Sequence, residues 1–406
     1  MRKVRICVVG TGGIFSGYHF PVIKMMNDRV ELVAVCDRDP EVAARAGTTC
    51  GVPHYTDFDE MLDKHPDAEI VYVTVYMLAH HELAVRAARG KRNVFIEKPM
   101  AMTRQCADLI ISECRKNGVR FEVAENFPLM PRDQLFARVV REGIIGDVQR
   151  VYLHDPINPF NMDIGVHRLS QMRESSTVEF DSLVGIIQQV AHEKFLKAVD
   201  TPKMGQRNYC DPLMYHRAHA IVNFRNGAKG IFECSPTMHK PSPGTYRCRQ
   251  VIGTKGIISD NIWPTLHGKM PGNDLVIELF EDGNTRTVPV RRKSRRVDGK
   301  LVLDSIVVGT KPKLAWETPF KDKPFTDWQI ACACEMMSLV DAVVSDKEVV
   351  YGEKGRQDLE YYFAIVESDH LGVKEVKLAL PPEPTALERR INELYRERFG
   401  RDPLDV

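Results

Sequence analysis

The sequence predicts an α/β protein whose N-terminal domain holds a doubly wound parallel sheet and whose second domain is built on an antiparallel sheet. Three observations predict this fold. Short β-rich runs alternate with helix-length segments over the first third of the 406 residues, as in parallel sheets that helices cover. A glycine-rich turn directly follows the first of these runs. Farther along, Asn-Gly and Asp-Gly pairs separate β-rich runs, which is typical of hairpins.

The elements of the first domain alternate in a regular order. Pro21 is compatible with the first turn of the first helix, because proline lacks an N–H that this turn does not need. The expected strands are Val4–Val9, Val30–Val35, Glu69–Val75, Val94–Ile96 and Arg120–Ala124. The helices expected around them are Phe20–Asn27, Pro40–Ala46, Thr56–Lys64, His80–Arg89 and Met102–Asn117.

After about residue 127 the pattern changes to hairpins, with turns at Asn226-Gly227 and Asp282-Gly283. The strands expected there are Val148–His154, His219–Phe224, Lys229–Cys234, Tyr246–Ile252, Leu275–Phe280 and Thr285–Val290. Helices are expected at Arg132–Glu142, Asp327–Ser345, Lys354–Leu371 and Leu387–Phe399. The predicted domains are therefore residues 1–126 and 127–380, followed by a C-terminal tail, residues 381–406.

The composition excludes several classes of protein. A net charge of +1 argues against a nucleic-acid partner, because such proteins usually carry a strong basic excess. No run of about 18 apolar residues and no signal peptide is recognised, so we expect no membrane partner. The ten cysteines lack zinc-binding spacing, which favours reduced thiols, a cytoplasmic location and no metal site. The one basic run, Arg291–Arg296, is more typical of a solvated face than of an anion-binding patch.

The glycine-rich turn, Gly10-Thr11-Gly12-Gly13-Ile14, follows a strand and precedes a helix. Backbone N–H groups in such a turn can approach the pyrophosphate of a dinucleotide. Phe15 stands where the third glycine of this fingerprint is expected. Asp37 ends the second strand, where a carboxylate accepts hydrogen bonds from ribose hydroxyls. The alternative is a plain glycine turn with an aspartate that caps a helix.

The neighbour of Asp37 leaves the choice of dinucleotide open. Arg38 could meet a 2′-phosphate, so NAD is favoured over NADP without excluding the latter.

Two further motifs carry possible acid–base chemistry. Glu97-Lys98-Pro99 follows a strand directly, so Lys98 lies at the edge of the sheet where doubly wound folds bind ligands. Taken alone, a Lys-Pro turn is more often a structural feature. Asp163 and His167 are spaced i, i+4, which places both side chains on one helical face. There the carboxylate could orient an imidazole that acts as a base, although a capping aspartate and a core histidine would show the same spacing.

Together these motifs resemble the glucose-fructose oxidoreductase / inositol dehydrogenase (Gfo/Idh/MocA) family. The matching segments occur in order along most of the chain: Gly10–Gly13, Asp37, His80 with Glu82-Leu83-Ala84, Gly90-Lys91, Glu97–Pro99, Ala124–Phe127, Gly143–Gly146, Asp163 with His167, Gly253–Gly256 and Tyr351-Gly352-Glu353. The resemblance implies a Rossmann domain followed by an α+β domain of open, mostly antiparallel sheet. It also implies an NAD(P)-dependent oxidoreductase that forms a homodimer or homotetramer through the exposed face of that sheet.

The resemblance implies roles for particular residues. Lys98, Asp163 and His167 would be the catalytic set, with His167 as the preferred base. The residues implied to bind the cofactor are Gly10, Gly12, Gly13, Ile14, Asp37, Arg38, Thr74, His80, Glu97 and Lys98. Tyr152, Asn161 and Arg168 flank the helix that carries His167 and are candidate substrate contacts.

The sequence also departs from the family pattern around the substrate. Thr74-Val75-Tyr76 stands where the family often has Thr-Pro-Asn, and Ser170 stands where an acidic residue is common.

Three functions remain open at this stage. The first is a dehydrogenase that acts on a secondary hydroxyl of a sugar, sugar derivative or cyclitol. The second is a redox-neutral glycosidase that keeps NAD bound and works by oxidation, elimination and reduction. The third is a non-enzymatic sensor of NAD(P) and sugar, which ranks last because Lys98, Asp163 and His167 are all present.

Overall fold

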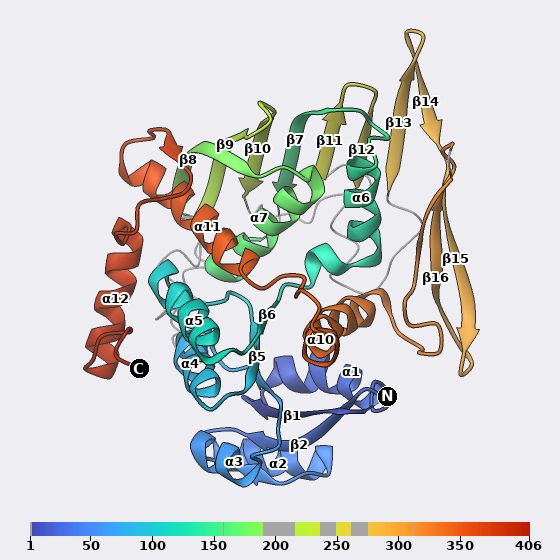
Figure 1. The fold of residues 1–406 in the computed structure, drawn as a ribbon. Coiled ribbons are helices and arrows are strands. Elements are labelled where there is room, and N and C mark those ends of the chain that lie inside the picture. Colours follow the sequence, from blue (N-terminus) through green and yellow to red (C-terminus); the bar gives the residue numbers. More distant parts are fainter. Residues whose placement is uncertain (1, 157, 190–215, 236–248, 261–274, 312) are drawn as a thin grey trace. The chain divides into compact units, whose positions relative to one another are not determined.

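The computed structural model describes residues 2–156, 158–189, 216–235, 249–260, 275–311 and 313–406 (Figure 1). The chain divides into two compact units. The first unit comprises Met1–Leu129, Trp328–Leu359 and Asn392–Val406, and the second comprises Met130–Asp327 and Glu360–Ile391. The expected strand Tyr246–Ile252 begins outside the described residues, and its described part belongs to the strand Arg249–Gly253.

The first unit contains a six-stranded parallel sheet in the order β3-β2-β1-β4-β5-β6. The order reverses between β1 and β4, so the carboxyl ends of these strands form the switch point at which doubly wound sheets bind ligands. The strands are apolar along most of their length because helices cover both faces of the sheet. Their bounds are β1 Val4–Val9, β2 Val30–Cys36, β3 His54–Tyr55, β4 Ile70–Val73, β5 Asn93–Glu97 and β6 Phe121–Ala124. The helices are η1 Phe15–His19, α1 Phe20–Met25, α2 Pro40–Cys50, α3 Phe58–Lys64, η2 Met77–Ala79, α4 His80–Arg89, α5 Arg104–Asn117 and η3 Phe127–Leu129.

Helix α10, Asp327–Ser345, also belongs almost entirely to this first unit. Its Ser338 hydroxyl donates a hydrogen bond of 2.7 Å to the buried Glu122 carboxylate of β6. The first unit is therefore not the contiguous segment 1–126 that we expected, because later parts of the chain pack into it. The expected tail, residues 381–406, is divided in the same way between the two units.

Among the described helices, α10 is also long and apolar enough to cross a membrane by length and composition alone. In this structure 61% of its apolar stretch is buried within the protein, as in the core helix of a soluble domain.

The second unit is built on a nine-stranded sheet in the order β14-β13-β12-β11-β7-β10-β9-β8-β18. It is mostly antiparallel, as expected, and the pair β7–β10 is parallel. The bounds are β7 Val148–Asp155, β8 Phe180–Gln189, β9 His216–Phe224, β10 Lys229–Cys234, β11 Arg249–Gly253, β12 Gly256–Asp260, β13 Val276–Glu281, β14 Asn284–Val288 and β18 Val376–Lys377. The helices are α6 Pro131–Arg141, α7 Met162–Ser176, α11 Lys354–His370 and α12 Ala386–Phe399, the last two of which continue into the first unit.

Helix α7 covers one face of this sheet. A Cβ at Gly230 of β10 would lie 2.4 Å from the Met172 side chain of α7. Val151 and Val222 flank Gly230 in register, so their side chains share this covered face.

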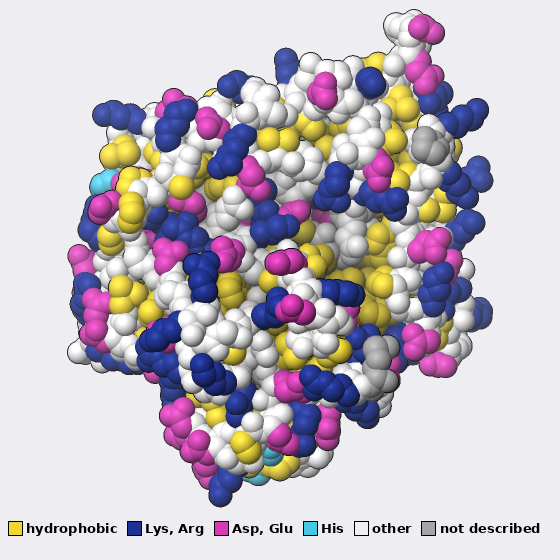
Figure 2. Space-filling view, in the orientation of Figure 1, with side chains coloured by type: hydrophobic (Ala, Val, Ile, Leu, Met, Phe, Trp, Pro, Cys, Tyr) yellow, Lys and Arg dark blue, Asp and Glu magenta, His cyan; other side chains and the backbone are white. Residues whose placement is uncertain are grey.

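The basic run forms part of a third sheet that we did not predict. β15 Val290–Val297 pairs with β16 Lys300–Val308, which pairs with β17 Leu314–Glu317. Arg292 is paired with Asp327 and Arg295 with Asp304, while Lys and Arg side chains gather along this edge of the molecule (Figure 2). The run is therefore the edge strand of a sheet, and charged side chains on edge strands oppose aggregation.

A buried ionic network joins α6 to two strands of the second unit. The Arg249 guanidinium donates to Asp133 at 2.7 Å and also to Asp260, and it lies 4.1 Å from the centre of the Phe136 ring. Gln171 of α7 donates to the same Asp133 oxygen. Burial raises the pKa of Asp133, but the charges of Arg249 and Arg132 outweigh burial and hold that pKa below its ordinary value. Each buried charge thus has a partner of opposite sign.

Replacement of Arg249 by alanine should destabilise the protein by about 3–5 kcal/mol, because it leaves two carboxylates buried without their main partner. The measurement is urea denaturation at pH 7 followed by circular dichroism. Since the folded-state pKa of Asp133 is lowered, the wild-type network stabilises above the unfolded value of about 4 and is lost as the pH falls through the folded value. Arg286→Ala, which breaks an exposed pair with Glu281, is the control and should leave the urea midpoint unchanged. An unchanged midpoint for Arg249→Ala would contradict the importance of this network.

Candidate active site

The glycine turn begins directly after β1, where its backbone lies close to the segment that follows β4. Gly10 has φ +90°, and a Cβ there would lie 2.6 Å from the Val75 nitrogen, so this position requires glycine. The Thr74 hydroxyl donates a hydrogen bond of 2.6 Å to the Gly10 carbonyl oxygen. Thr74 therefore holds the two strand ends together at the switch point.

The next two glycines have a different role, because a Cβ at Gly12 or Gly13 would meet nothing within 4 Å. This open space adjoins the backbone N–H groups that start the helix. A pyrophosphate fits such a place, since it needs close access to backbone N–H groups. Ile14 is 47% exposed beside this turn, as an apolar contact for a cofactor requires.

The helix after the turn starts with a π-turn, η1, that the sequence did not predict. The Phe20 N–H donates to the Phe15 carbonyl oxygen, five residues back, and α1 follows directly. Phe15 occupies the place of the third fingerprint glycine, which normally permits close packing of helix on strand. Its side chain is 2% exposed and is therefore packed inside the first unit.

Asp37 lies directly after β2, as predicted. Its Oδ2 accepts a hydrogen bond of 2.8 Å from the Thr11 N–H, which joins this carboxylate to the glycine turn. The residue that caps α2 is Asp39, whose side chain accepts from Glu41 and Val42. Asp37 is therefore not the helix cap of the alternative interpretation. Arg38 is exposed beside it.

Lys98 follows β5 at the same carboxyl edge of the sheet, and the Lys98–Pro99 peptide bond is cis. Glu97, the last residue of β5, is hydrogen-bonded to His19 of η1. His19 was not among the site residues predicted from the sequence. The signal was a histidine in the turn that directly follows the glycine loop.

His80 has a structural position near this turn. It is 1% exposed, and its two ring nitrogens lie 2.8 Å from the Pro99 oxygen and 3.1 Å from the Val75 oxygen. The imidazole supports the Lys98–Pro99 turn from inside the domain, so its side chain does not face an open cofactor site as expected. Burial lowers the pKa of His80.

Asp163 and His167 lie on α7 of the second unit. The Asn161 side chain caps this helix by accepting a hydrogen bond of 2.8 Å from the Ile164 N–H. Asp163 is exposed in the first turn and His167 is 4% exposed one turn later, on the same helical face. The predicted helical spacing of this pair is therefore present.

The other two candidate substrate residues have different surroundings. The Arg168 guanidinium is buried and donates to Asp155 at 2.6 Å and to Gln171 at 2.7 Å. Tyr152 lies in register with Ile231 of β10, on the face of the sheet opposite to the one that α7 covers. The structure does not bring Tyr152 together with His167, because successive side chains of a strand point to opposite faces.

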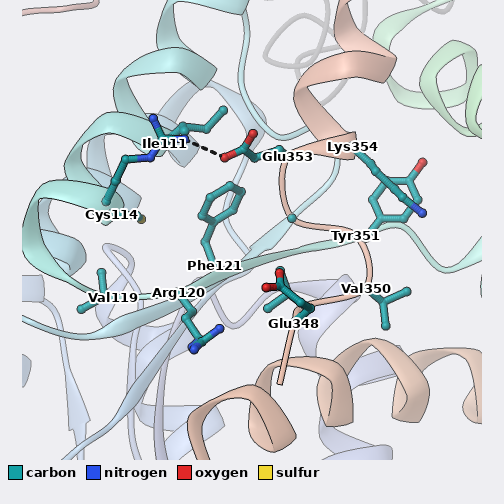
Figure 3. A pocket seen from close by; sticks show the side chains of 13 residues that line it. Ile111, Cys114, Val119, Arg120, Phe121, Glu348, Val350, Tyr351, Glu353 and Lys354 are labelled. Carbon is teal, nitrogen blue, oxygen red and sulfur yellow. Dashed lines mark hydrogen bonds and ion pairs between the residues drawn. The ribbon is translucent and has the colours of Figure 1, made fainter. Parts of the chain in front are cut away.

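A cavity of about 430 Å³ lies elsewhere in the first unit, between α5, the start of β6 and the segment before α11 (Figure 3). Its charged side chains include Arg115, which pairs with Glu353 at 3.0 Å, and Arg120, which bonds to Asp346. Phe121, at the amino end of β6, also lines it. Since ligands bind at the carboxyl ends of such strands, we assign this cavity no part in the site.

Comparison with known proteins agrees with a Rossmann fold in the first unit. Residues 4–125 match the family described as "Oxidoreductase family, NAD-binding Rossmann fold", named GFO_IDH_MocA. Residues 4–125 therefore resemble the NAD-binding Rossmann domain of the Gfo/Idh/MocA oxidoreductases.

Two relatives and one solved structure illustrate the range of similarity. Over 147 residues the chain is 32% identical to the D-apiose dehydrogenase of Paraburkholderia graminis, covering 36% of this chain and 38% of that protein. Over 276 residues it is 25% identical to the myo-inositol 2-dehydrogenase of Thermotoga maritima, covering 64% and 77%. The structure of levoglucosan dehydrogenase in complex with NADH has a TM-score of 0.68 at 18% identity, covering 94% and 100% of the two chains, and it shows the shared fold. The chain spans less than half the length of the first curated relatives it matches.

Replacement of Asp37 by alanine should raise the dissociation constant for NAD about tenfold or more, because a charge-assisted hydrogen bond to the ribose is lost. NADP should lose much less, since a carboxylate opposes its 2′-phosphate. The measurement is isothermal titration calorimetry with both dinucleotides. Asp39→Ala is the matched control: it removes the α2 cap at a cost of about 1 kcal/mol in stability but should keep the NAD preference. Equal losses for both dinucleotides would show that Asp37 does not contact the ribose.

Proposed function

We propose that this protein is an NAD(P)-dependent dehydrogenase that transfers a hydride between a nicotinamide cofactor and a secondary hydroxyl of a sugar, sugar derivative or cyclitol. The observation that carries the proposal is the position of Lys98. It follows β5 at the carboxyl edge of the sheet whose switch point holds the glycine turn and Asp37. The two relatives described above are named as dehydrogenases of D-apiose and of myo-inositol, which supports this substrate class.

The residues divide the chemistry between them. The nicotinamide, when bound, accepts or supplies the hydride. His167 takes the proton of the hydroxyl as oxidation proceeds, and Asp163, one helical turn away, orients the imidazole and stabilises its positive charge. Lys98 hydrogen-bonds the reacting oxygen and shares in moving its proton. Since the pKa of a lysine falls beside another positive charge, an oxidised nicotinamide favours this role near neutral pH.

The polar residues near α7 act as supports in this proposal. Asn161 fixes the start of the helix that carries Asp163 and His167, and Arg168 ties that helix to β7 through Asp155. Both residues thereby help to shape the substrate site.

The redox-neutral glycosidase is not favoured, because the family match and the relatives named above are oxidoreductases. The sensor is also not favoured, because the complete set of Lys98, Asp163 and His167 is present.

Replacement of Lys98 by alanine should lower kcat by about 100-fold or more, because a group that transfers a proton is lost. The dissociation constant for NAD should stay within about threefold of the wild-type value, since the glycine turn is intact. The assay follows the absorbance of reduced nicotinamide with a panel of sugars, glycosides and cyclitols, and calorimetry gives the NAD affinity.

The matched control is Lys116→Ala, which removes a lysine exposed on α5 of the same unit and should leave kcat unchanged. Wild-type turnover in Lys98→Ala would refute the assignment of Lys98. Cleavage of a glycoside without net reduction of the cofactor would favour the glycosidase instead.

We also propose that two copies associate through the open face of the nine-stranded sheet, giving a homodimer or a homotetramer. Val184, Ile221, Ile231 and Tyr152 form one row across β8, β9, β10 and β7 on this face. Ile221 is 58% exposed and Ile231 is 50% exposed. Adjacent exposed isoleucines on a sheet face are typical of protein interfaces.

Replacement of Ile221 by lysine should therefore shift the protein toward monomer, because a charge would be buried in the contact between two copies. Size-exclusion chromatography with multi-angle light scattering measures the mass. The control is Leu301→Lys on β16, a leucine that is 68% exposed on another sheet and should leave the mass unchanged. A monomeric wild-type protein would contradict the proposal.

We further propose a cytoplasmic location. The eight cysteines among the described residues are all free thiols, which a reducing compartment favours.

A further inference from the structure

A histidine–carboxylate pair connects the turn after the glycine loop with the strand that precedes Lys98. The Nε2 of His19, in η1, lies 2.5 Å from Oε1 of Glu97, the last residue of β5. The two side chains are only 5% and 13% exposed. A charge-assisted hydrogen bond of this length, shielded from water, is stronger than one on the surface.

Aromatic side chains fix the orientation of the imidazole. The rings of Tyr72 and Phe95 stack on each other with centroids 4.2 Å apart, and the His19 ring stands edge-on to both. These apolar walls offer the ring little room to turn, so its nitrogen stays directed at Glu97.

The other oxygen of the same carboxylate reaches the backbone of the lysine. Oε2 of Glu97 accepts a hydrogen bond of 3.2 Å from the Lys98 N–H. His19, Glu97 and the Lys98 backbone therefore form a continuous chain of hydrogen bonds at the end of β5.

We propose that His19 is a positioning residue for Lys98. Through the Glu97 carboxylate, His19 holds Lys98 in place and balances the charge around it. This inference rests on the proposed function, because it assumes that Lys98 acts on the substrate. A displacement of a catalytic group by 1 Å can lower turnover about 100-fold, so a rigid support for Lys98 has a direct effect on rate.

Because the groups around Glu97 are titratable, the effect of His19 on turnover should depend on pH. The titratable groups that face it are His19, Lys98 and His80, together with Cys332 and Glu335 on α10. Burial raises the pKa of Glu97, but the hydrogen bond and charge of His19 and the charge of Lys98 outweigh it, so that pKa lies below its ordinary value. Glu97 is therefore an anion at neutral pH.

Glu335 adds no second negative charge to this group. Burial and the charges of Glu97, Glu122 and Glu125 raise the pKa of Glu335 well above its ordinary value, so its carboxyl group is neutral at neutral pH.

Loss of the His19 imidazole would leave Lys98 beside a carboxylate that lacks its main hydrogen-bond donor. An uncompensated negative charge raises the pKa of a neighbouring lysine. In a plot of kcat against pH, the limb that reports the titration of Lys98 should then move to higher pH. Removal of the carboxylate charge should move the same limb to lower pH.

The test compares His19→Ala, His19→Gln and Glu97→Gln with the wild-type protein over the range pH 6 to about 10. His19→Ala should lower kcat about 10- to 100-fold and shift the limb upward, while the NAD dissociation constant changes less than about threefold. His19→Gln should recover part of kcat, because its amide can still donate to Glu97, and its upward shift should be smaller than that of His19→Ala. Glu97→Gln should shift the limb downward.

The matched control is His65→Gln. His65 belongs to the same unit and also bonds through Nε2, at 3.1 Å from the Tyr55 hydroxyl, and this variant should keep the wild-type kcat and pH profile.

Wild-type kcat and an unshifted limb in both His19 variants, with Lys98→Ala inactive, would overturn this inference and leave the proposed function intact. An equal loss of kcat at every pH, without recovery in His19→Gln, would show that His19 has only a structural role. That result would also overturn this inference. Full turnover in Lys98→Ala would instead refute the proposed function itself. If His19→Ala does not fold, as judged by circular dichroism, His19→Gln and Glu97→Gln still decide the question through their opposite shifts.

Discussion

The close approach of β1 and β4 at Gly10 is the constraint on which the site depends. A residue with a side chain would separate these strand ends, because its Cβ would lie 2.6 Å from the Val75 nitrogen. The Thr74 hydroxyl stabilises the same point by its hydrogen bond to the Gly10 oxygen. The glycine turn, Asp37 and Lys98 directly follow β1, β2 and β5. Because these strands are parallel members of one sheet, all three lie at the same edge of it. A small steric requirement in the backbone thus helps to fix the position of the glycine turn at this edge of the sheet.

Local pattern was sufficient to predict most of the first unit. The strand Val4–Val9 and the helix His80–Arg89 have the expected bounds, because each is a continuous apolar or amphipathic segment between clear turns. The π-turn η1 was missed, since no local residue pattern in this segment marks a π-turn. The bond between His19 and Glu97 was missed for a related reason: the two residues are 78 positions apart, and only the fold makes them neighbours.

The second unit shows the limits of local pattern more strongly. Its hairpin turns were visible as Asn-Gly and Asp-Gly pairs. The side chains of the basic run are half-buried or exposed, in line with the predicted solvated face, but charge conceals strand periodicity, so β15 itself was not recognised. The domain limits were also incomplete. Helix α10 looks like a continuation of the second domain in sequence, yet its Ser338 bonds to Glu122 in the first unit. The i, i+4 spacing predicted that Asp163 and His167 share one helical face. That Tyr152 lies on the face of the sheet opposite to α7 could not be predicted, because it depends on the register of the strands.

The π-turn at η1 also has an evolutionary consequence. Its hydrogen bond spans five residues instead of four, so this segment holds one residue more than an α-turn between the same two ends. A single-residue insertion can be absorbed here without rotating the helix that follows, and such turns recur at functional sites. When homologous chains are aligned from the glycine turn, positions after Phe15 can therefore differ by one while the folded backbones still superpose. The alignment of this loop is best anchored on the partner of Glu97 and not on a count of residues from Gly10.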